Sequence, residues 1–564
     1  MQKVCSNPWC HQPFDIADED LVHYDQCSPI FGGIKFLIPP PSQCPDCRQQ
    51  RRLAWRNERN LYSRDCALCG KHMISVHAPS APYPVYCVNC WWSDRWDRLS
   101  FGRVYNPARP FLDQWVELRS VVPQLAIQND NGIESENSEY CYDISRCKDC
   151  YRLIGSWYDR ECHYGLNINE SRNVVDCNTV SINSELVYES LDSQRCYHCT
   201  YLQNCENCHD CFFGFDLKGC SNCFCCYGLR QKTFCIFNEQ HTEEDYRAKM
   251  ESFHLGSFLS VQEAERQFDA WVLKFPRLYA NIQHSEDCEG NNLFHCKSVL
   301  GYSVFNAEYC KYVDRSDKPV HSYDLINNGG AQWCTDCVTP DDSYQTHFST
   351  WCWKSKNILL SDNCHSSEHL LGCISLHRAK YCILNKQYSK AEYEALAGTI
   401  IDALKEEGEW GEHLPVRLSP FGYNESAASE YYPLTKDDVV ARGWHWSDQL
   451  PYTTGKETIA METIADDIAD VPDSIVQEVL ACTACGKNYK LIPAELDFYR
   501  KMPCPIPRRC PDCRHLVRFA KKTPTRLWDR SCDKCGKEFR TTYQPSRPEQ
   551  IFCLECYRKE RFES

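Results

Sequence analysis

The two ends of this chain carry copies of one cysteine pattern, and that pattern restricts the fold more than any other feature. Shifted by 466 residues, residues 44–90 align without a gap on residues 510–556, with 18 identities in 47 positions. Each copy holds two sets of paired cysteines, most of them spaced C-x2-C. Two such turns can aim four thiolates at one point, which is the tetrahedral shell of structural zinc. The four predicted ligand sets are Cys5, Cys10, Cys44 and Cys47; Cys66, Cys69, Cys87 and Cys90; Cys482, Cys485, Cys510 and Cys513; and Cys532, Cys535, Cys553 and Cys556.

The residues around these cysteines favour zinc. Cys-Gly-Lys occurs at 69–71, 485–487 and 535–537, where glycine can adopt a positive φ and the lysine offsets thiolate charge. The Cys5-x4-Cys10 spacing departs from the others, and disulfides or buried thiols are the alternative for every set. Filled shells leave no open coordination position, so we expect about four structural zinc ions that fold small modules and carry out no chemistry.

Cysteine is unusually frequent in the whole chain, with 42 in 564 residues. The chain begins without an apolar signal segment, and no apolar run approaches the roughly 18–20 residues that a membrane helix needs. We therefore expect a cytoplasmic protein without a membrane segment. In a reducing compartment, metal binding or burial explains so many thiols better than disulfides do.

Charge is distributed unevenly along the chain. The total is −15, but residues 1–127 sum to +2 and residues 482–564 to +9, which leaves −26 for the middle. The linkers at 48–65 and 514–531, which join the two ligand sets of each copy, mix arginines with aromatic residues. Because arginines pair with phosphates and aromatic rings stack on bases, RNA, DNA or a ribonucleoprotein is a candidate partner. The candidate contacts are Arg48, Arg52, Arg64, Arg514, Arg518, Arg526, Arg530 and Trp528. The alternative is that these arginines compensate the zinc thiolates and cap helices.

The middle of the chain predicts stacked short strands. Between about 141 and 240, apolar dipeptides recur every 11–12 residues and are separated by Asn, Asp, Ser and Gly, which is typical of a β-solenoid or β-helix. Residues 288–385 have the same texture, and the two tracts end on similar segments at a shift of 147. Amphipathic helices expected at 243–250 and 391–404 would cap the open sheet edges. The cysteines of the middle form either a buried core ladder, which we favour, or further metal sites.

The expected fold is therefore mainly β, with central β-solenoid or β-helix-like repeats and capping helices between duplicated double zinc-ribbon or treble-clef modules. The expected domains are an N-terminal double zinc module at 1–127, a first repeat with its helix at 128–285, a second at 286–415, a connector at 416–480 and a C-terminal double zinc module at 481–564. Within the connector, residues 453–473 are expected to form a mobile tether.

Several long segments resemble one family. They are CPDCRQQRRLAWRNERNLYSRDCALCGK, WWSDRWD, FCIFNEQHTEEDY, YCILNKQYSKAEY, PFGYNESAASEYYPLT, ELDFYRKMPCPIPRRCPDCRH and RSCDKCGKEFRTTY. This pattern is similar to uncharacterised cysteine-rich zinc-ribbon proteins of candidate-phylum bacteria, over nearly the whole chain. Separately, residues 482–514 look like the probable zinc-ribbon domain family, whose four ligands fall on Cys482, Cys485, Cys510 and Cys513. The resemblance implies the architecture and leaves the activity open.

Catalytic motifs are absent from the sequence: GxSxG, GxxxxGK[ST], GxGxxG after a strand and HExxH do not occur. The leading hypothesis is a non-enzymatic zinc scaffold that contacts nucleic acid or a ribonucleoprotein through its basic modules, with a protein partner along the acidic middle. The second is a purely structural or protein-interaction scaffold. The third is a polysaccharide-acting β-helix enzyme, which rests on analogy of fold. The oligomeric state is left open.

Overall fold

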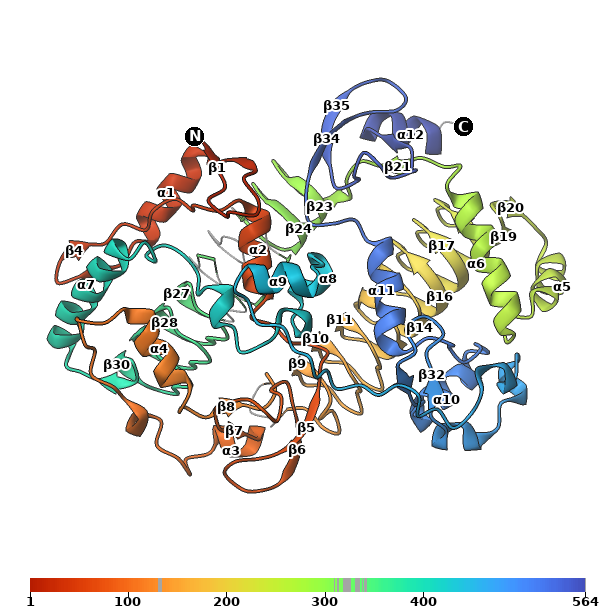
Figure 1. Cartoon of the computed structure of the whole chain (residues 1–564). Coiled ribbons are helices and arrows are strands. Elements are labelled where there is room, and N and C mark those ends of the chain that lie inside the picture. The colour runs from red at the N-terminus through yellow and green to blue at the C-terminus, as the bar shows by residue number, and fades with distance from the viewer. Residues whose placement is uncertain are drawn as a thin grey trace.

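The computed structural model describes residues 1–129, 134–308, 310–311, 314–317, 326–329, 335–336, 338 and 342–562. It is a mixed α/β structure with two regions of parallel strands and a cysteine-rich module at each end of the chain (Figure 1). The helices at the chain ends and between the tracts make the fold less purely β than the sequence indicates. None of the described helices is both long and apolar enough to cross a membrane.

The N-terminal module consists of short hairpins that alternate with helices. Its elements are β1 (Gln2–Val4), β2 (Pro13–Asp15), α1 (Asp18–Cys27), β3 (Ile30–Phe31), β4 (Ile34–Lys35), α2 (Pro45–Leu53), β5 (Tyr62–Asp65), β6 (His72–Ser75), β7 (Val85–Tyr86), α3 (Val88–Trp92), a 3₁₀ turn at Leu99–Phe101, α4 (Phe111–Arg119) and β8 (Gln124–Leu125). Strand β7 pairs in parallel with β8, which fixes the end of the module against the start of the first region of parallel strands.

The C-terminal module repeats this plan. Its elements are β32 (Leu480–Ala481), β33 (Asn488–Tyr489), α10 (Pro493–Lys501), α11 (Pro511–Lys521), β34 (Trp528–Ser531), β35 (Glu538–Thr541), β36 (Ile551–Phe552) and α12 (Leu554–Phe562). The 466-residue shift carries β5, β6 and β7 onto β34, β35 and β36 with identical bounds. Helices α2 and α11 both begin on a proline directly after a cysteine N-cap, a position where the missing N–H costs nothing. The duplication predicted from sequence is confirmed.

The first tract, residues 141–240, is a parallel stack of short strands. The strands are β9 (Tyr142–Ser145), β10 (Ile154–Trp157), β11 (Leu166–Asn169), β12 (Arg172–Val175), β13 (Asn178–Ser181), β14 (Glu185–Tyr188), β15 (Leu191–Gln194), β16 (Tyr197–Gln203), β17 (His209–Phe215), β18 (Ser221–Tyr227), β19 (Thr233–Ile236) and the antiparallel β20 (Glu239–Gln240). Pairing advances by 12 residues, as Tyr142 to Ile154 and Tyr197 to His209, with a 13-residue step from Asn178 to Leu191.

A three-residue period runs through this stack. From Asp143 to Ile182, and again from Asn183 to Phe237, every third residue has a left-handed φ. Asn, Asp and Gly tolerate that conformation best, which explains why they punctuate the sequence here. One 12-residue step of the register therefore contains four left-handed residues. The sequence interpretation found the 12-residue period and missed the shorter one.

The second tract, residues 282–387, is also built of parallel strands, but pairing advances by 11 residues from Ile282 to Leu293 and by 12 from Tyr344 to Lys356. Its strands are β22 (Ile282–Gln283), β23 (Glu289–Phe294), β24 (Leu300–Phe305), β25 (Asp314–Asp317), β26 (Ile326–Gly329), β27 (Tyr344–His347), β28 (Lys356–Leu359), β29 (Glu368–Leu371), β30 (Lys380–Ile383) and β31 (Lys386–Gln387). The predicted repeat between about 309 and 341 lies largely outside the described residues. From Asp342 to Leu384 every third residue is again left-handed.

Both tracts end on the same structural unit, an antiparallel strand pair followed by a helix. The 147-residue shift carries β19 and β20 onto β30 and β31, and it carries the start of α5 (Glu243–Phe253) onto the start of α7 (Lys390–Glu406). Tyr246 of α5 and Tyr393 of α7 are buried against their tracts, so both predicted capping helices are confirmed. Ser389 and Glu392 form a capping box that starts α7.

The connector packs on both terminal modules, with its first part against α2 and its last part against α10. It holds α8 (Ala428–Tyr431), α9 (Lys436–Ala441) and short 3₁₀ turns. Ile464, Ile468, Val471 and Ile475 are buried in one core with α10. The prediction of a mobile tether at 453–473 is therefore wrong. The apolar residues that alternate with acidic ones in this segment are the ones that pack in that core.

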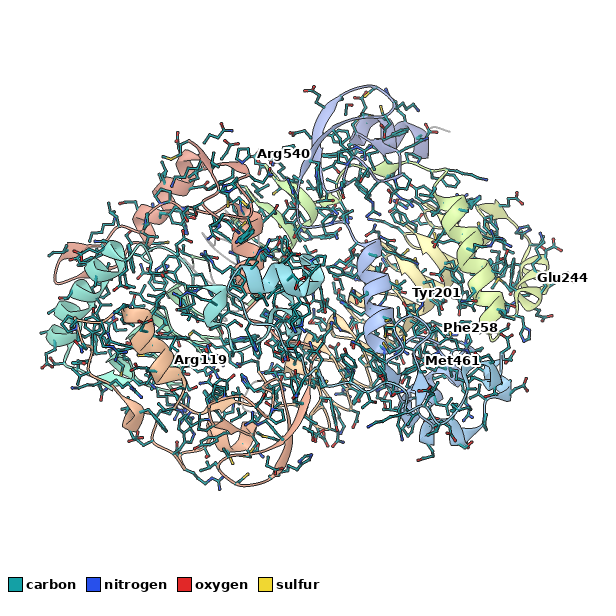
Figure 2. The ribbon with its side chains drawn as sticks, viewed as in Figure 1. Arg119, Tyr201, Glu244, Phe258, Met461 and Arg540 are labelled. Atoms are coloured by element: carbon teal, nitrogen blue, oxygen red, sulfur yellow. The ribbon has the colours of Figure 1, made fainter. Side chains whose placement is uncertain are left out.

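Each terminal module packs on the tract that is farther from it along the chain. The N-terminal module packs on the second tract, where Phe111 and Trp115 of α4 share a core with Leu371 and Ile383. The C-terminal module packs on the first tract, where Leu496 and Tyr499 meet Tyr188. Helix α6 (Phe258–Val272) and β21 (Arg277–Leu278), which joins β36 in parallel, complete this second half. In Figure 2, Arg119 at the end of α4 and Tyr201 with Phe258 beside α11 mark the two halves.

Candidate metal centres

The four predicted cysteine sets each come together in space. In every set the four sulfurs lie within 4.8 Å of one another. Each set has the same construction: a short hairpin supplies two sulfurs from its turn, and the first turn of a helix supplies the other two. Cys44, Cys87 and Cys510 are the N-caps of α2, α3 and α11, and Cys553 directly precedes α12. The sequence predicts cysteine clusters of this kind in zinc-ribbon or treble-clef modules, and the four clusters are present.

The distances between sulfurs fit a bound ion and exclude disulfides. The sulfurs of Cys10 and Cys44 lie 3.7 Å apart, and those of Cys485–Cys510 and of Cys535–Cys553 lie 3.8 Å apart. Ligands at about 2.3 Å from a tetrahedral zinc are separated by about 3.8 Å. A disulfide requires about 2.05 Å. Sulfur donors alone, four in number and mostly buried, suit zinc among the common divalent ions.

Three of the sites share one hairpin turn, or knuckle, bond for bond. The N–H of Cys66 donates to the Lys71 carbonyl at 2.9 Å, and Gly70 donates back to the Cys66 carbonyl at 2.9 Å. The same two bonds recur from Cys482 and Gly486, and from Cys532 and Gly536. The three glycines have φ of 72°, 72° and 77°, a region where a Cβ would be strained. The Cys-Gly-Lys sequence is therefore a backbone requirement of the knuckle.

The first site also brings four sulfurs together, but its hairpin has a different turn. Its longer Cys5-x4-Cys10 loop closes with a bond from the Cys5 N–H to the Gln12 carbonyl, and His11 takes the left-handed φ. The Asn7 side-chain amide donates to the Cys47 sulfur at 3.1 Å. An extra donor of this kind stabilises thiolate, and the exceptional spacing does not prevent the site from forming.

One thiol in each of the second, third and fourth sites is prepared to ionise. The N–H of Cys44 donates to the Cys5 sulfur at 3.3 Å, and Cys87 and Cys553 donate in the same way to Cys66 and Cys532. Burial opposes ionisation of Cys66, but backbone donors outweigh it and lower its pKa to about 7. The same balance lowers the pKa of Cys482 to about 7 and that of Cys532 to about 6. Helix N-termini add a favourable field for thiolate ligands.

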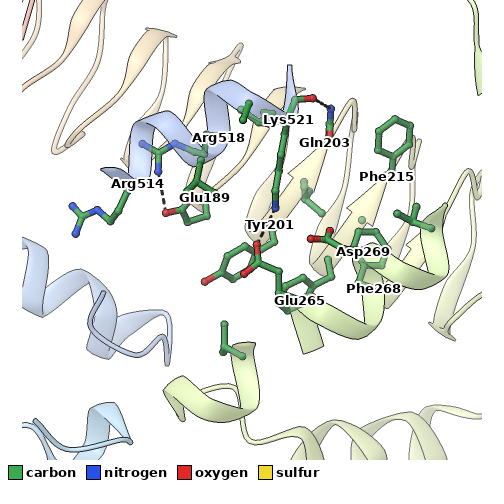
Figure 3. Close-up of a pocket in the computed structure, with 18 of the residues that line it drawn as sticks. Glu189, Tyr201, Gln203, Phe215, Glu265, Phe268, Asp269, Arg514, Arg518 and Lys521 are labelled. Atoms are coloured by element: carbon green, nitrogen blue, oxygen red, sulfur yellow. Dashed lines mark hydrogen bonds and ion pairs between the residues drawn. The ribbon is translucent and has the colours of Figure 1, made fainter. Parts of the chain in front are cut away.

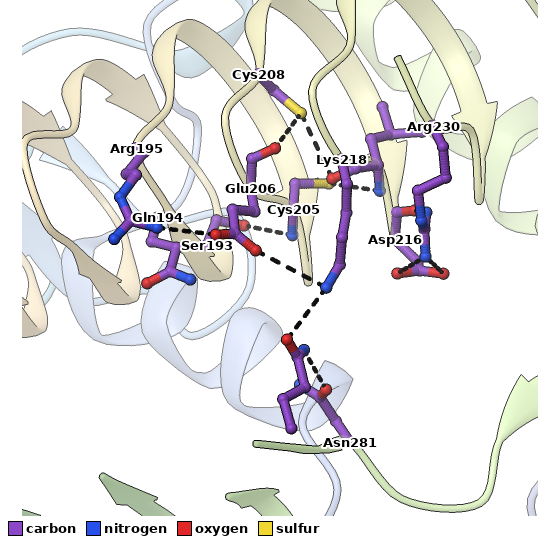
Figure 4. Close-up of polar contacts among 12 residues, drawn as sticks. Ser193, Gln194, Arg195, Cys205, Glu206, Cys208, Asp216, Lys218, Arg230 and Asn281 are labelled. Atoms are coloured by element: carbon purple, nitrogen blue, oxygen red, sulfur yellow. Dashed lines mark hydrogen bonds and ion pairs between the residues drawn. The ribbon is translucent and has the colours of Figure 1, made fainter. Parts of the chain in front are cut away.

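The cysteines of the first tract form a ladder. Apart from Cys225, which has a left-handed φ and packs in the core beside α6, they fall on the inward position of the three-residue period. Cys196, Cys199, Cys208 and Cys211 are fully buried in one core cluster. No four-sulfur group forms among them in the described part of the chain. Inward Ser and Cys side chains also accept the N–H of the residue 12 positions on, as Ser193 does from Cys205 at 3.2 Å (Figure 4). Cys141 accepts from Leu153 in the same way at 3.4 Å. Small residues that can accept a hydrogen bond are therefore what this interior requires.

Four of the eight nucleic-acid candidates lie inside the protein. Arg48, Arg52, Arg514 and Arg518 are at most 4% exposed. Arg52 pairs with Asp336 of the second tract, and Arg518 pairs with Asp176 of the first tract at 3.0 Å. Because these guanidinium groups are buried against carboxylates, they are not available to a phosphate, and their placement does not support that role. The arginines balance tract carboxylates, whereas the alternative interpretation assigned them to zinc thiolates.

The other candidates are nearer the surface. Arg526 lies 5.5 Å over the ring of Trp528 and 3.4 Å from Asp46. Arg64 donates to the carbonyls of His77 and Ala78, and Arg530 lies 3.5 Å from Asp533. Sequence position alone could not separate these from the buried four, because the tract acids that claim Arg52 and Arg518 are remote in the chain.

The two modules touch each other through equivalent positions. Arg59 lies 3.0 Å from His515, and Gln49 lies 3.0 Å from Thr525. Under the 466-residue shift Gln49 corresponds to His515, and Arg59 corresponds to Thr525. The same pair of positions therefore meets twice, with the modules exchanged, as at a two-fold interface between identical subunits. Glu430 of the connector accepts from Arg59 at 2.9 Å and lies 3.0 Å from His515.

Together, fold and sites define a class: a chain of parallel β tracts held by duplicated tetrathiolate modules. No family model matches the sequence, and no curated protein matches it. A solved structure described as "putative acetyltransferase from Desulfovibrio desulfuricans G20" aligns with 49% of this chain and 81% of its own, at 11% identity and a TM-score of 0.09. At that score the alignment carries no argument about fold or function.

Proposed function

We propose that this protein is a zinc-dependent, non-enzymatic scaffold in which four structural zinc ions fasten the chain ends to two β tracts. The observation that carries the proposal is that all four clusters offer four sulfurs from paired turns. Four protein ligands fill a tetrahedral shell, so no position is left for a water or substrate. The zinc ions would supply folding free energy only.

We further infer that the tracts are four-sided β-solenoids. The support is the parallel register in steps of mostly 12 residues together with the left-handed residue at every third position, over the first tract and over residues 342–384 of the second. A solenoid offers long, regular faces, which repeat proteins use to bind partners. On the first tract, Glu206 lies between Arg195 at 2.8 Å and Lys218 at 3.8 Å, so charges of adjacent coils alternate (Figure 4). The acidic excess of the middle makes a basic protein surface the partner of choice.

The zinc sites gain their structural role from the arginines beside them. Cys510 and Cys513 begin α11, and the same helix carries Arg514 and Arg518, which meet Asp176 at 3.0 Å each. In the other half, α2 carries Arg51 and Arg52, which meet Asp336. A zinc ion that fixes the helix start therefore also fixes two buried charges on the tract.

Cobalt substitution tests the proposal. The full chain is reconstituted with Co²⁺, and its visible spectrum is recorded before and after azide or cyanide is added. A tetrathiolate spectrum that exogenous ligands leave unchanged is expected, because every shell is filled. A spectrum that shifts with added ligand would reveal an open position and would favour a catalytic metal over a scaffold.

Nucleic-acid contact is a second candidate, favoured by the +9 charge of residues 482–564 and by the surface pair of Arg526 and Trp528. The test is binding of single-stranded RNA and DNA by the full zinc-loaded chain over a range of salt. A binder loses affinity steeply as salt rises. Absence of binding at low salt would rule out nucleic-acid contact and favour the protein-interaction scaffold. Binding that is unaffected by Arg526→Gln with Trp528→Ala would show that this surface pair is not the contact. A cytoplasmic location is part of both proposals.

A further inference from the structure

A cavity of ≈ 420 Å³ lies in the C-terminal half, between the first tract, α6 and α11. This volume falls in the range of about 300–1,000 Å³ that is usual for small-molecule sites. Figure 3 shows Lys521 reaching from α11 to Glu265 on α6, with the pair closing one side at 2.9 Å. Tyr201 and Phe213, stacked with centroids 4.5 Å apart, form part of the apolar wall, with Phe268 opposite.

The equivalent space in the N-terminal half is filled. Under the 466-residue shift, Lys521 corresponds to Trp55, which is 2% exposed and packs edge-on against Trp115 at 6.1 Å. Helices α4 and α6 correspond as well: Asp113-Gln-Trp-Val precedes β8 as Asp269-Ala-Trp-Val precedes β21. In the N-terminal copy the indole of Trp55 therefore fills this position, whereas in the C-terminal copy Lys521 stands there and a cavity remains.

Two buried cations line the open cavity, and each keeps one unsatisfied donor nitrogen. Arg277 and Arg508 are 6% and 8% exposed. Nη2 of Arg508 donates to the carbonyls of Ile464 and Ala465, but Nη1 of each arginine has no hydrogen-bond partner among the described residues. Arg277 lies 3.8 Å over the ring of Phe215, and Arg508 lies 5.0 Å over Phe258. A buried donor that is left unsatisfied is costly, and an anionic group would satisfy it.

Several other charges of the cavity are already paired. Arg518 meets Glu189 at 2.9 Å, Lys521 meets Glu265, and Arg547 meets Glu549 at 2.7 Å. Even with Asp269 counted, the lining holds more basic than acidic side chains, and Arg277 and Arg508 are each backed by an aromatic face.

We propose that this cavity binds a small molecule with an aromatic or apolar body and one anionic group, which Arg277 and Arg508 receive. The aromatic wall takes the body by stacking, and the cations take a carboxylate, phosphate or sulfonate by charged hydrogen bonds. This site does not depend on the scaffold proposal, because it lies between the tract and two helices and uses no zinc ligand.

Two fluorescent probes with the same aromatic body test the proposal on the full zinc-loaded chain. Anilinonaphthalene sulfonate carries the anion, and phenylnaphthylamine lacks it. We expect saturable binding of the sulfonate at one site, roughly tenfold or more tighter than the neutral probe. Arg277→Gln and Arg508→Gln should weaken the sulfonate by a similar factor and leave the neutral probe unchanged.

Lys521→Trp provides the decisive variant, because it copies the indole that fills this position in the other half. It should abolish binding of both probes while the melting temperature and zinc content stay the same. Arg266→Gln is the matched control, since Arg266 lies on the exposed face of α6 in a pair with Glu263. Sulfonate binding that survives Lys521→Trp, or equal affinity for the two probes, would overturn the proposal.

Discussion

At the residue scale, the arginines of the linkers have the clearest meaning. Arg52 and Arg518 occupy equivalent positions of α2 and α11, and each is buried on an aspartate of the tract its module covers. The sequence shows the arginines and their equivalence. It could not show their partners, because a carboxylate far along the chain becomes a neighbour only after both the module and the tract have folded.

Asp176→Asn should destabilise the protein strongly. The Asp176 side chain is fully buried and faces both Arg514 and Arg518 at 3.0 Å. Removing its charge leaves two buried cations without that anion, so we expect a loss of about 3–5 kcal/mol in the free energy of unfolding. Urea unfolding at constant free zinc measures it. Asp529→Asn, whose side chain is 96% exposed, is the control and should change stability by less than about 0.5 kcal/mol. Equal effects of the two variants would contradict the buried network.

The contact between the modules should depend on pH through His515. Burial, reinforced by Arg59, lowers the pKa of His515 to about 4. An unfolded histidine titrates near about 6.5, so the unfolded chain binds the proton more readily, and stability falls as pH drops from about 6.5 towards about 4.

His515→Gln, which installs the residue found at the equivalent Gln49, removes this contribution. The free energy of unfolding of the variant should therefore depend less steeply on pH in that window than that of the wild type. The zinc thiolates titrate in both proteins and cancel in the comparison. Parallel pH profiles would show that His515 is not held neutral.

At the element scale, the hairpin turns and the inward ladder use cysteine for different purposes. C-x2-C followed by Gly-Lys recurs in the hairpin turns of three of the four cysteine clusters. The spacing predicts these ligands because local geometry decides them. In the tract, cysteines three residues apart look equally ligand-like in sequence, yet the left-handed residue between them turns each side chain into the interior. Backbone conformation distinguishes the cysteines of the hairpin turns from those of the tract interior. Residue identity alone does not reveal that conformation.

Alkylation should distinguish these two groups of thiols. In the native chain, a zinc chelator should expose the sixteen clustered sulfurs of the four sites to iodoacetamide. Cys196, Cys199, Cys208 and Cys211 should stay protected, because they are 0% exposed in the tract core. Peptide mass spectrometry before and after chelation gives the answer. Ladder cysteines that become reactive with the rest upon chelation would indicate metal in the tract.

At the scale of the whole molecule, two related halves are crossed and joined by their modules. The 466-residue repeat and the 147-residue repeat were both visible in sequence, but their crossed pairing was not. The exchange of Trp55 for Lys521 was also visible as an aligned pair. Its consequence, a filled core in one half and a cavity in the other, emerges only when α4 and α6 are placed beside it.

Zinc removal should loosen the two ends and spare the tracts. The tract cores contain apolar side chains and thiols without a four-sulfur site in the described residues, so they should keep their strands when the modules lose metal. Limited proteolysis of the chelated chain should cut within 1–127 and 481–562 before it cuts the tracts. Simultaneous cleavage throughout would show that the tracts depend on zinc as well.

The most direct test of the central claim is the zinc content of the purified full chain, measured by elemental analysis and by native mass spectrometry. Four ions per chain are expected, and Cys532→Ser should reduce the number to three, since each cluster holds one ion. A mass that shows disulfides in place of metal, or a zinc content near zero, would contradict the account.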